Sequence, residues 1–161
     1  MSAAPGIDAP GDRGTGPTRV LFVCTHNSAR SIMAEVLLRE KGGPAYQVAS
    51  AGTEPGEVRP LTLRVLEEAG LPTAGLHSKS VSDFVGQAFD YVITVCDSAR
   101  QDCPIFPGEG ERLHWGYDDP SVVQGSEEER LRAFRRVFTA ISQRIDLFLT
   151  VRRKLDSTDP T

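Results

Sequence analysis

A short apolar run that stops at a cysteine, followed by a polar loop and a helical stretch, most limits how this chain can fold. Residues 20–23 are consistent with a buried parallel strand, and Cys24 follows them directly. Residues 30–41 then place apolar side chains on one face before a Gly-Gly-Pro run ends the helix. A strand, a loop and a helix in this order favour a parallel sheet, in which ligands bind beyond the carboxyl ends of the strands.

The remainder of the chain alternates between strand and helix patterns in the same way. The last predicted helix is the clearest, because Ser126 and Glu129 form a capping box and apolar side chains recur at three- and four-residue steps from Leu131 to Phe148. The alternation implies a parallel sheet covered on both sides. The other predicted elements are strands over 46–50, 91–95 and 112–115, a helix from Pro60 to Gly70, and a short helix capped by Ser80 or Ser82 that contains Phe84 and Val85.

Length, charge and cysteine content narrow the class of protein. A chain of 161 residues fits one domain, expected over 18–155, with disordered tails at 1–17 and 156–161 where large apolar side chains are scarce. The net charge of −4, with no basic run, argues against a nucleic-acid partner. The sequence has no long apolar stretch and no secretory signal, so we expect a cytoplasmic location and no membrane partner. Nothing in it requires more than a monomer.

The loop CTHNSARS at 24–31 predicts an oxyanion site. Inward-facing backbone N–H groups and the following helix N-terminus can hold an anion, and the Arg30 guanidinium matches two oxygens of a tetrahedral oxyanion. The same field favours the thiolate form of Cys24, to which Ser31 can donate a hydrogen bond. A buried structural cysteine is the alternative, but the context favours a nucleophile. The predicted binding residues are Thr25, His26, Asn27, Ser28, Ala29, Arg30 and Ser31, with His26 at the mouth and without a catalytic role.

At these residues the chain resembles the family that unites low-molecular-weight protein tyrosine phosphatases with thioredoxin-coupled arsenate reductases. The resemblance runs from about Arg19 to Leu149. It implies an α/β fold, a three-layer sandwich with a four-stranded parallel sheet flanked by helices. The segments that carry it are VCTHNSARS at 23–31, SAGT at 50–53, TVCD at 94–97, Cys103-Pro104, and Trp115 through Asp119-Pro120.

The resemblance also implies a role for each matching position. Cys24 would be the nucleophile, and Arg30 would clamp the oxyanion. Asp119, just before Pro120, would be the general acid that protonates the leaving oxygen, although an Asp-Pro pair read alone is more often a turn. The positions that would support the loop and its thiolate are Asn27, Ser31 and Ser50.

Two further cysteines distinguish reduction from hydrolysis. A reductase must pass on two electrons, so a second thiolate attacks the arsenic-bound cysteine, expels arsenite and leaves a disulfide. Cys96, at the end of the third predicted strand, and Cys103, seven residues later, fit this relay. A helix over 96–103 would span about 10.5 Å, whereas a disulfide needs alpha carbons within about 7 Å, so that bond should unwind the segment. A core Cys96 and an incidental surface Cys103 are the structural alternatives.

These residues predict an arsenate reductase with a Cys24–Cys96–Cys103 relay that a thioredoxin-like donor reduces. A low-molecular-weight tyrosine phosphatase is the alternative, but Ser121-Val122-Val123 lacks the aromatic residues that such phosphatases place after Asp-Pro. A non-enzymatic oxyanion or redox sensor is a third hypothesis. We expect no cofactor and no zinc, because the three cysteines lack paired short spacing. We also expect no bound monovalent cation, because Pro72 stands where the family's cation-binding reductases have an acidic residue.

Overall fold

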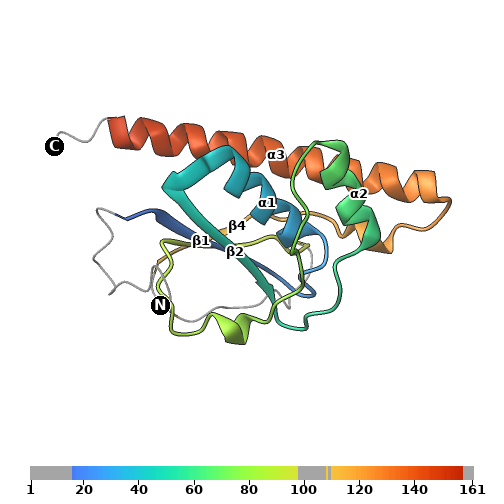
Figure 1. Cartoon of the computed structure of the whole chain (residues 1–161), viewed down its shortest axis with the longest axis horizontal. Helices are drawn as coiled ribbons and strands as arrows, with labels where there is room; N and C mark the ends of the chain where they lie inside the picture. Colours follow the sequence, from blue (N-terminus) through green and yellow to red (C-terminus); the bar gives the residue numbers. More distant parts are fainter. Residues whose placement is uncertain (1–15, 98–107, 109, 158–161) are drawn as a thin grey trace.

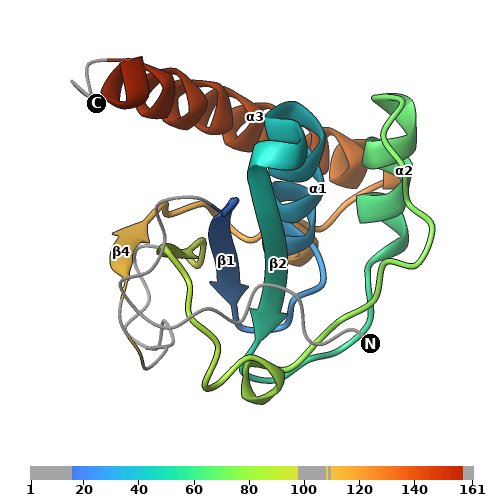
Figure 2. The ribbon, with the colours of Figure 1, turned by 60° about the vertical axis from the view of Figure 1, so that its left-hand side comes forward.

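The structure is a computed structural model that describes residues 16–97, 108 and 110–157. Within these residues, four parallel strands form one sheet in the order β2-β1-β3-β4 (Figure 1). The predicted four-stranded parallel sheet is confirmed. Figure 2 shows β1 and β2 side by side with their arrowheads at the same edge of the sheet. The strands are β1 (Thr18–Cys24), β2 (Tyr46–Gly52), β3 (Tyr91–Thr94) and β4 (Glu111–His114).

The helices follow the predicted chain order. The capping box of the last helix is present, since Ser126 Oγ accepts from the Glu129 N–H at 3.1 Å and Glu129 Oε1 accepts from the Ser126 N–H at 2.8 Å. The short helix is capped by Ser80 as predicted, but it is a 3-10 turn that ends before Phe84 and Val85. The elements are α1 (Arg30–Gly42), α2 (Pro60–Glu68), α3 (Glu127–Ser157) and the 3-10 turns η1 (Gly43–Ala45), η2 (Val81–Asp83) and η3 (Pro120–Val122).

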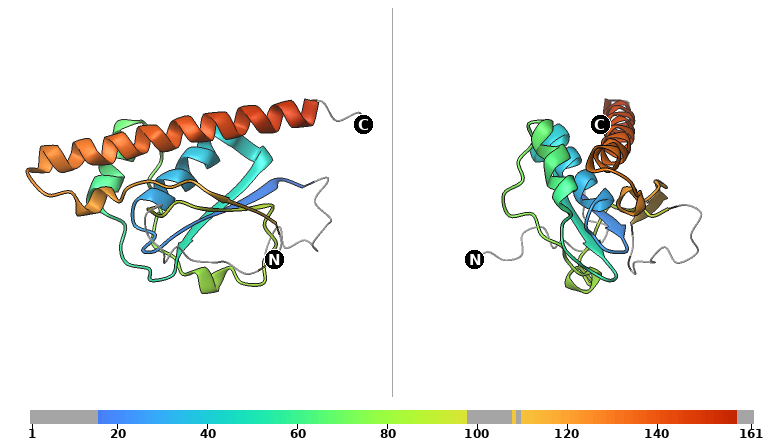
Figure 3. Two further views of the ribbon diagram at one scale, coloured as in Figure 1. Left: turned by 180° about the vertical axis from the view of Figure 1, so that it is seen from behind. Right: turned by 90° about the vertical axis from the view of Figure 1, so that its right-hand side faces the viewer.

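Helices α1, α2 and α3 gather on one side of the sheet, as the right-hand view of Figure 3 shows. On the opposite face, Val81 and Phe84 from the η2 region pack against Leu21 and Val23 of β1. The sheet is therefore covered on both sides, as predicted. Among the described residues the second cover is a segment with one 3-10 turn rather than a longer helix. Gly86, with φ of 93°, lies three residues beyond this turn in a left-handed conformation that does not continue a helix.

Strand β1 lies at the centre of the sheet and explains the apolar run with which the folded part begins. Its residues Val20 to Val23 are 0% exposed, because β2 and β3 flank the strand and both faces are covered. A strand buried in this way requires apolar side chains on both faces, and so it shows a continuous apolar run rather than alternation. Cys24 ends this strand at the carboxyl edge of the sheet.

The last helix is longer than the apolar pattern indicated. Helix α3 continues to Ser157, so Asp156 and Ser157, which we expected in the C-terminal tail, belong to the helix. Arg152 fastens its final turns to the sheet by donating to Thr18 Oγ1 at 2.9 Å and to the Tyr91 hydroxyl at 3.3 Å. Residues 1–15 and 158–161 lie outside the described residues, so disordered tails there stay a prediction. No helix of the described part is both long and apolar enough to cross a membrane.

The burial along α3 predicts where this helix contributes to stability. Ile141 is 0% exposed, whereas Leu147 on the same helix is 57% exposed. We expect Ile141→Ala to lower the free energy of unfolding by about 2–5 kcal/mol, because it leaves a cavity in the packed layer. Leu147→Ala is the matched control, for which we expect a change within about 0.5 kcal/mol. Urea unfolding measures both, and equal effects would contradict the packing described for α3.

Candidate active site

The predicted oxyanion loop joins the carboxyl end of β1 to the first turn of α1. Asn27 lies in it with φ of 52°, the left-handed conformation that asparagine tolerates better than most residues. The end of β2 supports the loop at close range, because Gly52 brings its backbone against Thr25 and Asn27. The loop thus lies on backbone atoms of the neighbouring strand, which leaves no room for a side chain at Gly52.

Two hydrogen-bonding groups, the Ser31 hydroxyl and the Asn27 N–H, contact the sulfur of Cys24. Its Sγ lies 2.9 Å from Ser31 Oγ and accepts from the Asn27 N–H at 3.2 Å. The residue is 2% exposed. Donors directed at a sulfur stabilise the thiolate, the form of cysteine that acts as a nucleophile. The contact between Cys24 and Ser31 expected from the sequence is present.

Asn27 ties the loop together through its side chain. The Nδ2 group donates to Ser31 Oγ at 2.8 Å and to Ser50 Oγ at 2.9 Å, and all three residues are fully buried. The resemblance named these residues as supports of the loop, and the structure brings them into one network. Because the amide fixes Ser31 and Ser50 together, the position of the Cys24 sulfur depends on both β2 and α1.

Arg30 and Asp119 meet across the site. The Arg30 side chain donates to the Tyr117 carbonyl at 2.9 Å, and its second terminal nitrogen lies 3.6 Å from Asp119 Oδ2. Arg30 is buried, with 7% of its surface exposed, although it carries a full charge. The residue expected to clamp the oxyanion therefore contacts the residue expected to donate the proton.

The charge state of Asp119 follows from several opposing effects. Burial raises the pKa of this carboxyl, whereas hydrogen bonds from the Ser121 hydroxyl and N–H, and the charges of Arg30 and Arg59, lower it. The lowering effects prevail, so the pKa of Asp119 lies below its usual value and the carboxylate is ionised at neutral pH. The Ser121 hydroxyl lies 2.7 Å from Asp119 Oδ1, and the Ser121 N–H lies 2.9 Å from it.

Cys96 lies two residues beyond the end of β3, the strand that pairs with β1. The Val95 N–H donates to the Val23 carbonyl at 3.0 Å, so the chain just before Cys96 runs alongside the end of β1. The Cys96 carbonyl accepts from the Tyr117 N–H at 3.3 Å, which links it to the segment that holds Arg30. The structure thus places the second predicted cysteine at the same edge of the sheet as Cys24. Cys103 lies outside the described residues.

A cavity of about 410 Å³ opens over this edge. Cys24 does not line it, whereas neighbouring loop residues and Cys96 do, together with residues of the segment 118–123 that carries Asp119 and is called the acid loop here. Arg30, which lines the cavity, supplies a positive charge for an anion bound there. His26 lies at the cavity, as expected for a residue at the mouth. The lining residues are Thr25, His26, Arg30, Cys96, Asp97, Asp118, Asp119, Val122 and Val123.

Three residues of the site carried no signal in the sequence. The Tyr117 carbonyl holds Arg30, the Ser78 hydroxyl donates to the Asn27 carbonyl at 2.6 Å, and the Lys79 N–H donates to Asn27 Oδ1 at 2.8 Å. Each contact joins segments at least 51 residues apart in the chain, so no local pattern could have revealed them. Within the described part, no cluster of three or more His, Cys, Asp or Glu residues could hold a metal ion.

Comparison with known proteins agrees with this geometry. The family described as low molecular weight phosphotyrosine protein phosphatase matches residues 19–158, and the chain belongs to that family. The chain is 38% identical to an arsenate reductase of Halalkalibacterium halodurans over 80% of its own length and 93% of the relative.

Two solved structures share the fold at similar identity. A crystal structure of arsenate reductase from Archaeoglobus fulgidus has a TM-score of 0.69 at 31% identity, covering 81% of this chain and 98% of that one. A thioredoxin-dependent arsenate reductase of Corynebacterium glutamicum has a TM-score of 0.59 at 31% identity, covering 85% of this chain and 66% of that longer one. The α/β fold and the family expected from the sequence are both confirmed.

The close packing at Gly52 predicts how the loop responds to a single methyl group. A Cβ at this position would lie 2.5 Å from the Thr25 carbonyl oxygen and 2.9 Å from the Asn27 nitrogen, so the loop backbone must move. We expect Gly52→Ala to weaken phosphate binding at least about tenfold, since displacements near 1 Å can cost that much. Gly56→Ala is the control, because a Cβ there meets no atom within 4 Å. Calorimetric titration with phosphate measures both, and equal affinities would refute this account.

The lowered pKa of Asp119 predicts a pH-dependent contribution to stability. Because the pKa is lower in the folded chain than in the unfolded one, the ionised carboxylate stabilises the fold above about pH 4, and this contribution is lost as the pH falls further. We therefore expect the difference in unfolding free energy between wild type and Asp119→Asn to shrink between pH 7 and pH 3. Urea unfolding across this range tests it, with the exposed neighbour Asp118→Asn as control. A constant difference would contradict the prediction.

Proposed function

We propose that this protein is a cytoplasmic arsenate reductase in which Cys24 attacks arsenate and Cys96 and Cys103 carry the oxidation away. One observation carries the proposal: Cys96 lines the same cavity as the oxyanion loop, at the sheet edge where Cys24 ends β1. A hydrolase does not use a second cysteine there. The arsenate reductases among the similar proteins support this assignment.

In the first step the Cys24 thiolate attacks arsenic, and an arsenic–oxygen bond breaks. Arg30 holds two oxygens of arsenate together with the amides of the loop, and the leaving oxygen takes a proton from Asp119 and departs as water. A bound dianion adds negative charge beside Asp119 and offsets the charge of Arg30, and both changes favour the protonated carboxyl. Arsenate thus releases Asp119 from its ion pair and prepares it as the acid.

The second step transfers two electrons to arsenic. The Cys96 thiolate attacks Cys24 Sγ, a sulfur–sulfur bond forms, and the sulfur–arsenic bond breaks with its electron pair remaining on arsenic. Arsenite leaves, and Cys24 and Cys96 are joined as a disulfide. This step needs the two sulfurs close together, and the pairing of β1 with β3 and the Val95–Val23 contact support it.

The third step restores the nucleophile. The Cys103 thiolate attacks Cys96, Cys24 departs as a thiolate, and the Cys96–Cys103 disulfide is presented to an external dithiol of the thioredoxin class. That donor supplies the two electrons that arsenic received. A relay of this kind requires a reducing compartment, which agrees with the cytoplasm. All steps use residues of one chain, so we propose that a monomer is sufficient.

The same loop can hydrolyse phosphate esters, and we expect weak phosphatase activity. Cys24, Arg30 and Asp119 suffice for it. The acid loop, however, presents Val122 and Val123 to the cavity instead of aromatic rings, and Val122 is 68% exposed. Aliphatic side chains give a phosphotyrosine ring little to stack on. Arsenate reduction is therefore the activity that this site supports best.

The relay predicts that loss of Cys96 stops repeated arsenate reduction without preventing arsenate binding. We expect Cys96→Ser to bind arsenate but to stop multiple turnover, because no thiol attacks the arsenic-bound Cys24. The measurement is arsenate-dependent NADPH oxidation with a thioredoxin system, run on wild type and on each cysteine variant. Aryl phosphate hydrolysis is the control, and Cys96→Ser should leave it intact while Cys24→Ser abolishes it. Sustained arsenate turnover by Cys96→Ser would rule out the relay.

A further inference from the structure

A buried carboxylate lies beneath the oxyanion loop. Glu35 of α1 has a side chain only 7% exposed, and its Oε1 accepts a hydrogen bond from Ser50 Oγ. Ser50 in turn accepts from Asn27, the residue whose backbone N–H donates to the Cys24 sulfur. The geometry of the nucleophile therefore depends, through two side chains, on an anion held away from water.

A buried anion is costly unless cations and hydrogen bonds compensate it. Two cations contact Glu35, and they contact different oxygens. Arg39 pairs with Oε2 from the next turn of α1, with 43% of its side chain exposed. Lys79 places Nζ 3.5 Å from Oε1 and is 16% exposed. Lys79 thus acts on the same oxygen that Ser50 uses, and it is the better shielded of the two cations.

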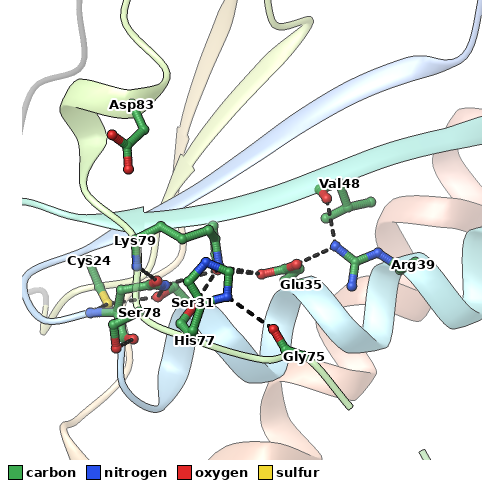
Figure 4. A network of polar contacts seen from close by, with 12 residues as sticks. Cys24, Ser31, Glu35, Arg39, Val48, Gly75, His77, Ser78, Lys79 and Asp83 are labelled. Atoms are coloured by element: carbon green, nitrogen blue, oxygen red, sulfur yellow. Dashed lines mark hydrogen bonds and ion pairs between the residues drawn. The ribbon is translucent and has the colours of Figure 1, made fainter. Parts of the chain in front are cut away.

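The backbone of Lys79 is fixed to the same network. Its N–H donates to Asn27 Oδ1 at 2.8 Å, and its carbonyl accepts from the Gly52 N–H at 2.9 Å. Its ammonium also donates to the His77 carbonyl at 2.9 Å. Figure 4 shows Lys79 between the Cys24 end of the network and Glu35. One residue therefore holds Asn27 through the main chain and Glu35 through the side chain.

We propose that Lys79 is a positioning residue for the nucleophile: its ammonium neutralises Glu35 and keeps the chain from Glu35 through Ser50 to Asn27 in the arrangement that holds Cys24. Without the ammonium, Glu35 Oε1 loses its cation and the carboxylate shifts toward Arg39 and water. The Ser50 hydroxyl then loses the carboxylate oxygen to which it donates. The hydrogen bond from Asn27 Nδ2 to Ser50 Oγ no longer fixes the Asn27 side chain. The proposal deepens the proposed function, because it rests on Cys24 as the nucleophile of this loop.

The test measures the rate at which iodoacetamide alkylates Cys24 at pH 7, followed at that residue by peptide mass spectrometry. We expect Lys79→Met, which keeps the backbone contacts, to slow alkylation about fivefold, a size usual for coupled contacts. Lys79→Arg, which keeps the charge, should stay near wild type. Lys41→Met is the matched control. Lys41 lies in the last turn of α1, at the end away from the loop, and its Nζ forms an ion pair with Asp146 Oδ1 at 2.9 Å. It should leave the rate unchanged.

A double-mutant cycle separates this role from a loss of general stability. If Lys79 acts through Glu35, then Lys79→Met should have little further effect in a Glu35→Gln background, where no buried charge needs compensation. An equal slowing in both backgrounds, or a Lys79→Met rate equal to that of Lys41→Met, would overturn the proposal. Should Lys79→Met fail to fold, Lys79→Gln enters the same comparisons. Alkylation needs no arsenate turnover, so a chain that proved unable to reduce arsenate would refute the function and leave this test standing.

Discussion

The hydrogen bond from the Asn27 N–H to the Cys24 sulfur is the interaction on which the site depends. It exists because Asn27 adopts a left-handed backbone that turns its N–H inward, and because Gly52 lets the loop rest on the end of β2. The Asn27 side chain then fixes Ser31 and Ser50. The buried Asn27 side chain thus satisfies both its donors and its acceptor, and it links the loop to the sheet and to α1.

The second constraint is electrostatic. Arg30 is a buried guanidinium that needs an anionic partner, and Asp119 is one such partner. In the proposed mechanism an entering arsenate competes for the same charge. Substrate binding and release of Asp119 as the acid are then linked, since both depend on Arg30. The cavity above them has aliphatic rather than aromatic walls on the side of the acid loop, so an aromatic ester finds little to stack on there.

Much of the fold followed from local patterns. The apolar run of β1, the Gly-Gly-Pro end of α1 and the capping box of α3 are short-range features, and the structure has all three. Two elements differ from the local prediction. The segment after Ser80 is a single 3-10 turn followed by a left-handed Gly86, and α3 runs on to Ser157 in the region where Arg152 contacts the sheet.

By itself the sequence determined the strand–loop–helix unit, the candidate nucleophile and its arginine, and the presence of three cysteines. These are properties of contiguous residues, where backbone geometry and side-chain type act over a few positions. Only the tertiary structure decided that Cys96 shares a cavity with the loop, that the Tyr117 carbonyl holds Arg30, and that Lys79 reaches both Asn27 and Glu35. Such contacts arise when parallel strands bring distant segments to one edge, and no spacing in the chain encodes them.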